Sequence, residues 1–406
     1  MKKRITFTQA MFLVPLLLLL GIFAIYPIIT SAVYSLFDYR TNDQSVAGLY
    51  TSSKFNAPLF TEDAGYITWY LDDDATLLEG DDKLAAQTII SEIDELAAPY
   101  KDTEEVISLD ASSSQAILDK MDKYNNDLKA IYSRNNSVEF YNGYDKLSLL
   151  FNEISTCKIS ENFNGLSAYK QILSDSRFGD SLGTTIIFTV ISVFFEFVLG
   201  LALALIMNKA IKGIGIVRTV SLIPWAIPTA VSALMWSYMY DGSYGVVAKI
   251  FTDLGFIASP EVMLLTKGGA LASAILADVW KTTPYMALLL LAGLQVIDNG
   301  LYESASIDGA GPVRTFFSIT LPLLKPSILV ALLFRTLDAF RVYDLIAVLT
   351  GGAQGTETLS IYAYKLMINQ SNYGYGSVVV LAMAACVGII SFIFVKVLGA
   401  ELLEDD

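Results

Sequence analysis

The sequence contains no histidine and only two cysteines, Cys157 and Cys386. Without histidine, the chain lacks the side chain that most often acts as a general base near neutral pH. The two cysteines lie in a polar region and in an apolar segment, so we expect no disulfide between them and no Cys/His metal site. A G-x-x-x-x-G-K-S/T loop is also absent, so the chain itself should not bind ATP. The sequence therefore predicts no enzyme and no bound cofactor.

Charged residues are also scarce. They make up 17% of the chain, hydrophobic residues make up 54%, and the mean hydropathy is +0.51. Several apolar runs reach the roughly 20 residues that a helix needs to cross a bilayer. Because a soluble protein rarely has such a composition, we predict an all-α polytopic membrane protein.

The first apolar run follows a basic cluster at Lys2, Lys3 and Arg4. A signal peptide is the alternative interpretation, but the run is longer than a usual signal sequence and lacks a clear cleavage site. We therefore predict an uncleaved first span whose amino end lies in the cytoplasm. The six predicted spans cover residues 11–36, 184–207, 218–240, 270–296, 327–349 and 378–398.

Six spans place both termini in the cytoplasm and residues 38–180 on the outer side. The short inner segments are richer in basic residues than the short outer loops, as the positive-inside rule requires. These inner residues are Lys2, Lys3, Arg4, Lys209, Lys212, Arg218, Arg314 and Lys325. The predicted division is residues 1–37 for the tail and first span, 38–180 for an acidic helical extracytoplasmic insertion, 181–400 for the other five spans, and 401–406 for a cytoplasmic tail.

The insertion, residues 38–180, carries 26 acidic and 12 basic residues, which accounts for the whole formal net charge of −14. This acidity argues against nucleic acid or an anionic membrane surface as its partner. Apolar residues recur every three or four positions in residues 89–97, 117–131 and 140–154. We therefore predict three amphipathic helices that pack as a small bundle. A coiled coil or a binding surface is the alternative.

Two local features of the insertion are also predicted. Ser112 and Gln115 fit a capping box at the start of the second helix. The acidic run over residues 72–82 lacks the glycine and glutamate spacing of an EF-hand, so we predict a solvated turn rather than a calcium site.

The fourth and fifth predicted spans each carry several ionisable residues, and each such residue costs at least about 2.5 kcal/mol and normally faces protein or water. In the fifth span, Asp338, Arg341 and Asp344 recur at a spacing of three, which predicts one shared helical face. Aromatic rings stack on the apolar side of a pyranose and charged groups bind its hydroxyls, so these spans suit a sugar. The candidate residues are Trp280, Lys281, Thr282, Tyr285, Asp338, Arg341, Tyr343 and Asp344. The alternative is that the charged residues form structural ion pairs between helices.

Two further residues in the spans are interpreted as structural. Glu196 is the only acidic residue in the second span, so we predict a structural role for it. Trp225 lies between Pro224 and Pro228, which predicts a kinked helix in which the tryptophan packs rather than binds a ligand.

The loop between the fourth and fifth spans, residues 298–326, is polar. Asp298 or Asn299 can cap a short helix whose first turn carries Glu303, a favourable position for a carboxylate. Small residues on this helix would let a partner surface approach its backbone.

The remainder of this loop predicts a second helix. Gly309 and Gly311 are expected to end the first helix, and Pro312 suits the first turn of the next one. Pro322 and Pro326 are then expected to turn the chain back into the membrane. A helix, a glycine break and a helix make a compact knob.

The loop reads E-S-A-S-I-D-G-A from Glu303, followed by I-T-L-P from Ile319, and it resembles the cytoplasmic coupling loop of ABC-importer permeases. Other segments are similar to the maltose/trehalose-type sugar permeases of that superfamily. They are RTVSLIPWAIP at 218–228, DVWKTTPY at 278–285, DAFRVYDL at 338–345 and LTGG at 349–352. The resemblance covers the six-span body.

This resemblance implies the type I ABC-importer permease fold with six transmembrane helices. It also implies several partners: a second permease chain, two ATPase subunits that bind ATP and Mg²⁺, and an extracellular solute-binding protein. Glu303 would pair with a basic residue of the ATPase. The coupling residues carried over are Glu303, Ser304, Ala305, Asp308, Gly309 and Pro322.

Two departures from the maltose permease leave questions open. Where that permease has asparagines, this chain has residues such as Arg341 and Val342, so the identity of the sugar is open. The maltose permease also carries a large outer loop that helps embrace its binding protein. A docking role for the insertion in this chain is therefore a hypothesis.

We therefore predict the permease subunit of an ATP-driven sugar importer in the cytoplasmic membrane, working by alternating access. Three alternatives remain at this stage. The first is an importer of glycerol phosphate, in which Arg335, Arg341 and Lys281 would bind phosphate. The second is a cation-coupled carrier, with Glu196, Asp278 and Asp344 as a relay. The third is a membrane-anchored receptor built around the acidic insertion.

Overall fold

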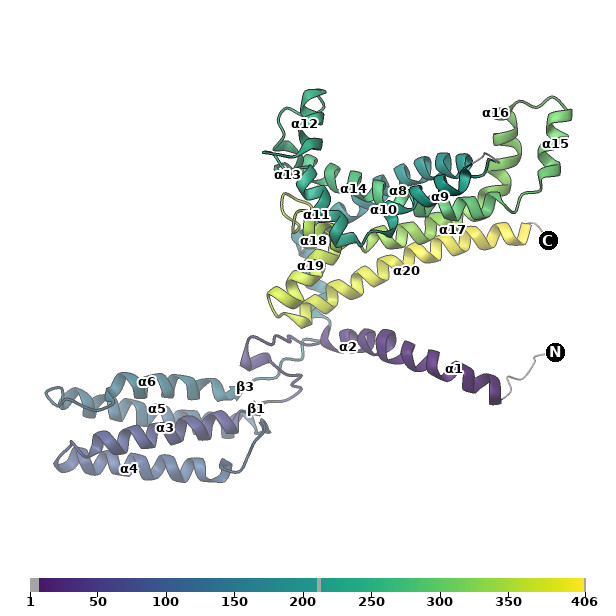
Figure 1. Ribbon diagram of the computed structural model, residues 1–406. Helices are drawn as coiled ribbons and strands as arrows, with labels where there is room; N and C mark the ends of the chain where they lie inside the picture. Colours follow the sequence, from purple (N-terminus) through teal and green to yellow (C-terminus); the bar gives the residue numbers. More distant parts are fainter. Residues whose placement is uncertain (1–6, 210–212, 405–406) are drawn as a thin grey trace. The chain divides into compact units, whose positions relative to one another are not determined.

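The computed structural model describes residues 7–209 and 213–404, which form helices joined by loops and short strands (Figure 1). The chain forms two compact units. The first comprises Met1–Ala168 and Gln370–Ser377, and the second comprises Tyr169–Asn369 and Val378–Asp406. The predicted basic residues Lys2, Lys3, Arg4 and Lys212 lie outside the described residues, as do the last two residues of the predicted tail.

Long apolar helices dominate the described part of the chain. Five of them are long and apolar enough to cross a membrane, and a bent pair makes a sixth if it counts as one span. The fold class predicted from the sequence is therefore confirmed. The five are Leu13–Tyr34, Ser176–Met207, Lys267–Leu294, Pro312–Phe340 and Tyr373–Lys396, and the bent pair is Ile214–Ala226 with Thr229–Met239.

In the first unit, the apolar segment at the amino end contains α1, a π-helical turn and α2, and four further helices form a bundle (Figure 1). The sequence predicted only three helices in this bundle, because α3 was missed. The bounds are α1 (Phe7–Leu20), the π-helical turn (Gly21–Ile25), α2 (Tyr26–Tyr34), α3 (Ala57–Ala75), α4 (Gly80–Ala97), α5 (Ala111–Arg134) and α6 (Gly143–Ile154). Short 3₁₀ turns occur at Gln44–Val46, Ala98–Tyr100 and Ser155–Cys157.

A small antiparallel sheet lies at one end of this bundle (Figure 1). Its central strand β1 (Lys54–Phe55) pairs with β2 (Ile107–Ser108) on one side and with β3 (Lys158–Ile159) on the other. The sheet therefore joins the points where the chain enters and leaves the four helices.

The bundle has an apolar core to which every helix contributes. Leu71, Ile93, Leu128 and Leu147 come from α3, α4, α5 and α6 in turn, and each is fully buried. Burying a side chain of this size contributes roughly 1.5–3 kcal/mol. The apolar stripes predicted for α4, α5 and α6 are confirmed as the buried faces of these helices.

One local prediction for the insertion is wrong, and another is wrong in part. Helix α5 is capped by Asp110, whose carboxylate accepts a hydrogen bond from the Ser113 backbone at 3.2 Å, and not by a box starting at Ser112. The acidic run is not wholly solvated either, because Asp74 is fully buried. Its carboxylate accepts hydrogen bonds from the Tyr132 hydroxyl at 2.8 Å and from two backbone amides at the start of α6, each at 2.9 Å. An acidic side chain thus ties α3 to α5 and α6.

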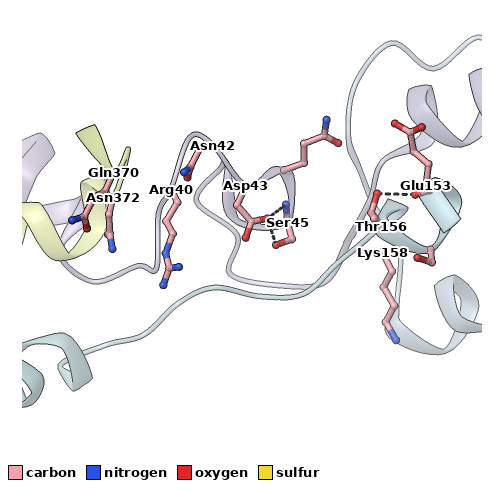
Figure 2. A pocket seen from close by; sticks show the side chains of 11 residues that line it. Arg40, Asn42, Asp43, Ser45, Glu153, Thr156, Lys158, Gln370 and Asn372 are labelled. Atoms are coloured by element: carbon pink, nitrogen blue, oxygen red, sulfur yellow. Dashed lines mark hydrogen bonds between the residues drawn. The ribbon is translucent and has the colours of Figure 1, made fainter. Parts of the chain in front are cut away.

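A polar hollow of about 880 Å³ lies in the first unit where three chain segments meet (Figure 2). The segments are residues 40–45, 153–158 and 370–372. The last of them is fixed by a hydrogen bond from the Thr41 amide to the Ser371 carbonyl at 3.1 Å. Close by, a Cβ at Gly374 would lie 2.2 Å from a backbone oxygen, so only glycine fits there. The residues just before the last apolar helix are therefore anchored in this unit.

The second unit is built on three long helices that pack on one another, namely α8, α14 and α17. Figure 1 shows α12 and α13 at one end of these helices and α15 and α16 at the other. Helix α7 (Ser167–Ser174) connects the two units in sequence. The bounds in the second unit are α8 (Ser176–Met207), α9 (Ile214–Ser221), α10 (Ile223–Ala226), α11 (Thr229–Met239), α12 (Val246–Asp253), α13 (Val262–Leu265), α14 (Lys267–Leu294), α15 (Asn299–Ile307), α16 (Pro312–Thr315), α17 (Leu321–Phe340), α18 (Asp344–Leu349) and α19 (Leu359–Tyr364), with π-helical turns at Phe316–Thr320 and Lys365–Asn369. Helix α20 (Tyr373–Glu404) begins in the first unit and continues in the second from Val378 on.

The fifth span differs from its prediction at both ends. A helix that begins at Pro312 continues through the π-helical turn into α17, so Pro322 and Pro326 lie within a helix and do not turn the chain. The π-helical turn shifts the hydrogen-bond register directly before Pro322. At its other end the helix stops at Phe340, short of the predicted 349.

Asp63 in the insertion is a buried acid without full hydrogen bonding. It lies on α3 and is 4% exposed, and its Oδ2 has no partner among the residues that the structure describes. Burial, together with the neighbouring carboxylates of Glu153 and Glu62, raises the pKa of Asp63 to about 7. Because this value lies above the 3.8 of a free carboxyl group, the folded state binds the proton more tightly than the unfolded state does. The contribution of Asp63 to stability is therefore present at low pH and is lost as the pH rises through about 7.

We predict that Asp63→Asn stabilises the protein at pH 8 and has little effect at about pH 4, close to the 3.8 of a free carboxyl group, because asparagine imitates the protonated acid. The measurement is the thermal midpoint of the full chain in detergent across this pH range. Asp73→Asn, an exposed acid on the same helix, is the control. An equal effect of Asp63→Asn at both pH values would contradict the assignment.

Candidate functional site

The third span is broken where α10 ends. Ile227 has an extended backbone (φ −72°, ψ 132°), because the residue before a proline avoids the helical region. The segments on either side of Ile227 and Pro228 meet at an angle of 87°. The kink predicted from Pro224 and Pro228 is therefore confirmed.

A second break interrupts the chain between α17 and α18. Arg341 ends α17 with φ −102° and ψ 19°, and Tyr343 has φ −132° and ψ −66°. Asp338 thus lies on one helix and Asp344 starts another, so the prediction that they share one helical face with Arg341 is wrong. Residues 338–344 contain neither glycine nor proline, so the sequence carries no local signal for this break.

The two breaks and helix α14 enclose a cavity of about 350 Å³ in the second unit. Six of the eight predicted sugar-site residues line it, although they come from different segments of the chain. They are Lys281, Thr282, Asp338, Arg341, Tyr343 and Asp344. The other residues that line it include Trp225, Thr229, Asp278 and Arg335.

Two predicted residues do not line the cavity. Trp280 packs edge-on against Trp236, with ring centres 5.5 Å apart. Tyr285 stacks on Trp225 at 5.5 Å with an angle of 12° between the rings. Trp225 itself lines the cavity, although the sequence was interpreted as giving it a packing role only. Tyr285 contacts the cavity wall through this stacking on Trp225.

Arg335 is the centre of an ion-pair cluster at the wall of this cavity and is 1% exposed. Its Nε and Nη2 atoms donate to both carboxylate oxygens of Glu196 at 2.5 and 2.9 Å. Nη2 also donates to Asp278, and Nη1 donates to Asp338 at 2.7 Å. The Glu196 carboxylate further accepts a hydrogen bond from the Thr282 hydroxyl at 2.6 Å. Glu196 is the only acidic residue in its own span, but it is paired with an arginine from another span. The presence of Arg335 in the fifth predicted span was the feature of the sequence that could have indicated this partner.

Lys281 also has partners within the protein. Its ammonium group donates to the carbonyl oxygens of Ile227 at 2.9 Å and Trp225 at 3.3 Å. These carbonyls lie at the end of α10, where helical hydrogen bonds stop and the acceptors need other donors. Lys281 therefore caps the broken span, whereas Arg341 and Asp344 remain exposed at the cavity.

The loop at residues 298–326 contains the two helices predicted for it. Asp298 caps α15 by accepting a hydrogen bond from the Gly300 amide at 3.0 Å. Gly309 has φ +75°, a conformation that favours glycine, and Pro312 starts α16. Glu303 lies in the second turn of α15 and not in the first as predicted, because the helix already begins at Asn299.

The predicted coupling residues differ in exposure. Ala305 is buried, with 9% of its surface exposed. Glu303, Ser304, Asp308 and Gly309 are exposed, as is Pro322 within the helix that follows. An exposed acidic side chain on a short capped helix can contact a basic partner surface without rearrangement of the loop.

Comparisons with known proteins agree on one family. Residues 196–403 match the family described as binding-protein-dependent transport system inner membrane component. The trehalose/maltose transport system permease protein MalF of Thermococcus litoralis is 47% identical over 237 residues, which is 58% of this chain and 79% of that protein. The trehalose transport system permease protein SugA of Mycobacterium tuberculosis is 43% identical over 254 residues, which is 63% of this chain and 80% of that protein.

A solved structure supports the fold. The crystal structure of a bacterial ABC transporter involved in the import of the acidic polysaccharide alginate has a chain with a TM-score of 0.53. The identity is 22%, and the match covers 58% of this chain and 84% of that chain. At this identity the likeness concerns the fold alone.

Lys281→Met is predicted to destabilise the second unit, because it leaves the carbonyls of Trp225 and Ile227 without this donor. We expect a loss of about 0.5–1.5 kcal/mol, the usual net contribution of one hydrogen bond. The check is the thermal midpoint of the purified chain, with Lys281→Arg, which keeps a donor, as the control. A Met variant as stable as the wild type would show that this cap contributes nothing.

Proposed function

Because the chain belongs to the family of binding-protein-dependent transport system inner membrane components, we propose that it is the permease subunit of an ATP-driven sugar importer. The proposed cargo is a sugar of the trehalose or maltose kind. The single observation that carries this proposal is the identity of 47% and 43% to permeases named for those sugars. The family also supports an importer over a cation-coupled carrier.

The cavity between the two broken spans supports a cargo site. Breaks in membrane helices are tolerated where the backbone lines a cavity, and such breaks often mark binding sites in transporters. Trp225 offers an aromatic face held by Tyr285. Arg341, Tyr343 and Asp344 offer groups that hydrogen-bond to sugar hydroxyls. Together they suit a ring that is apolar on one side and polar at its edge.

The charges around the cavity favour a neutral sugar over glycerol phosphate. Of the three cations considered for phosphate binding, Arg335 is already paired with three carboxylates and Lys281 is bonded to two carbonyl oxygens. Only Arg341 is left exposed at the cavity. An anion would also meet the carboxylates of Asp338 and Asp344 there.

The proposed complex contains a second permease chain, two ATPase subunits that hold ATP and Mg²⁺, and an extracytoplasmic binding protein. The chain lies in the cytoplasmic membrane with both termini inside and residues 38–180 outside. The coupling loop, residues 298–326, seats its exposed Glu303 against the ATPase. Closure of the ATPases around ATP displaces this loop, the spans rotate, and the cavity opens outward to receive sugar. Hydrolysis reverses the motion.

The test of this function is Glu303→Ala in the importer reconstituted with its partners in vesicles. We predict that sugar import falls by about tenfold or more, a usual size for coupling between sites, whereas the chain still inserts and folds. Glu261→Ala, an exposed glutamate beside α13 at the other end of the unit, is the matched control. If Glu303→Ala imports sugar at the wild-type rate, the assignment of the coupling loop fails.

A further inference from the structure

The Arg335 cluster joins three helices through one guanidinium group. Glu196 belongs to α8, Asp278 to α14, and Arg335 and Asp338 to α17. Each of the three nitrogens of Arg335 donates to a carboxylate. A cargo that displaced Arg335 would leave Glu196 and Asp278 as buried charges, and breaking a buried pair in this way is strongly destabilising. Arg335 is therefore not a cargo contact, although it lines the cavity.

Stability alone does not account for the cluster. Replacing a buried ion pair with apolar or neutral groups of similar volume is often neutral or even stabilising. Ionisable groups inside membrane spans are expensive and usually mark function. The position of Arg335, between the coupling loop and the cavity, is therefore what indicates its function.

On one side, the cluster connects to the coupling loop. Helix α14 ends at Leu294, directly before the loop, and α17 follows it. These two helices pack closely, because a Cβ at Gly293 would lie 2.3 Å from the Ser327 hydroxyl. Asp278 lies about 24 Å from Leu294 along α14, at 1.5 Å per residue. The two helices thus form one packed body between the loop and the cluster.

On the other side, the cluster connects to both breaks. Asp338, which is bonded to Arg335, lies at the end of α17 directly before the segment Arg341–Tyr343. Lys281 lies one turn beyond Asp278 on α14 and caps the break at Ile227. The same two helices that hold the loop therefore hold the segments that line the cavity.

We propose that Arg335 is a positioning residue that transmits displacement of the coupling loop to the cavity by holding α8, α14 and α17 together. This inference rests on the proposed function. It assigns to Arg335 a role in the rate of transport and none in the affinity for sugar.

The test is a variant without the three buried charges of the cluster: Glu196→Gln, Asp278→Asn and Arg335→Met together, in the reconstituted importer. The exposed Asp338 is left unchanged. The side chains keep similar volume, so we expect the variant to fold with a thermal midpoint close to that of the wild type. Basal ATPase should remain. The kcat of sugar import should fall by about tenfold or more, as for other couplings between sites, with KM unchanged. An unchanged kcat, or a rise in KM at an unchanged kcat, would overturn the proposal.

Two further variants separate positioning from a merely structural role. Arg335→Lys keeps the charge but has a single nitrogen that cannot reach the same three carboxylates in a fixed geometry, so kcat should again fall while the protein remains folded. Arg177→Met with Glu357→Gln removes an ion pair of the same unit that lies outside the cluster, and import should be kept. If the losses in kcat for all variants simply follow their thermal midpoints, the role of Arg335 is structural and the inference fails. If the wild-type complex imports no sugar at all, it is the proposed function that fails.

Discussion

A charge inside a membrane span needs a partner, and this requirement shapes the second unit. Arg335 pairs with three carboxylates that come from three helices. Lys281 meets the same requirement with backbone carbonyls exposed by the break at Ile227. Because these polar groups satisfy one another, they fix the helices at the point where the spans are interrupted. The cavity is a consequence of that arrangement, and the exposed side chains of Arg341 and Asp344 remain available at its edge.

The parts of the structure that follow periodic rules were predictable from the sequence. Apolar length indicated the spans, and spacings of three and four indicated the buried faces of α4, α5 and α6. Helix α3 was missed although its buried residues Phe60, Ala64, Ile67 and Leu71 follow the same spacing, because acidic and exposed aromatic residues lie between them. Asp74 was assigned to solvent for a related reason, since its hydrogen-bond donors are distant in sequence.

The candidate site was predicted in composition but not in geometry. The candidate residues came from two segments of the sequence, residues 280–285 and 338–344. The shared helical face expected for Asp338, Arg341 and Asp344 does not exist. The break after α17 has no glycine or proline and depends on packing between helices, so no local pattern could reveal it. The pairing of Glu196 with Arg335 likewise depends on tertiary packing, because the two residues lie 139 positions apart in the sequence. By contrast, the loop at residues 298–326 has its own cap, glycine and proline, so the starts of its two helices were predictable. The end of the second helix was not, because that helix continues through Pro322 and Pro326 into α17.

We propose that this chain works as one subunit of a sugar importer powered by a separate ATPase. The most direct measurement is to purify the tagged chain from its native membrane in mild detergent and to identify the proteins that accompany it. We expect a second permease chain, an ATPase and an extracytoplasmic binding protein to accompany it, and we expect trehalose or maltose uptake by the complex to require ATP. A chain that purifies alone and binds no ATPase when one is added would contradict it.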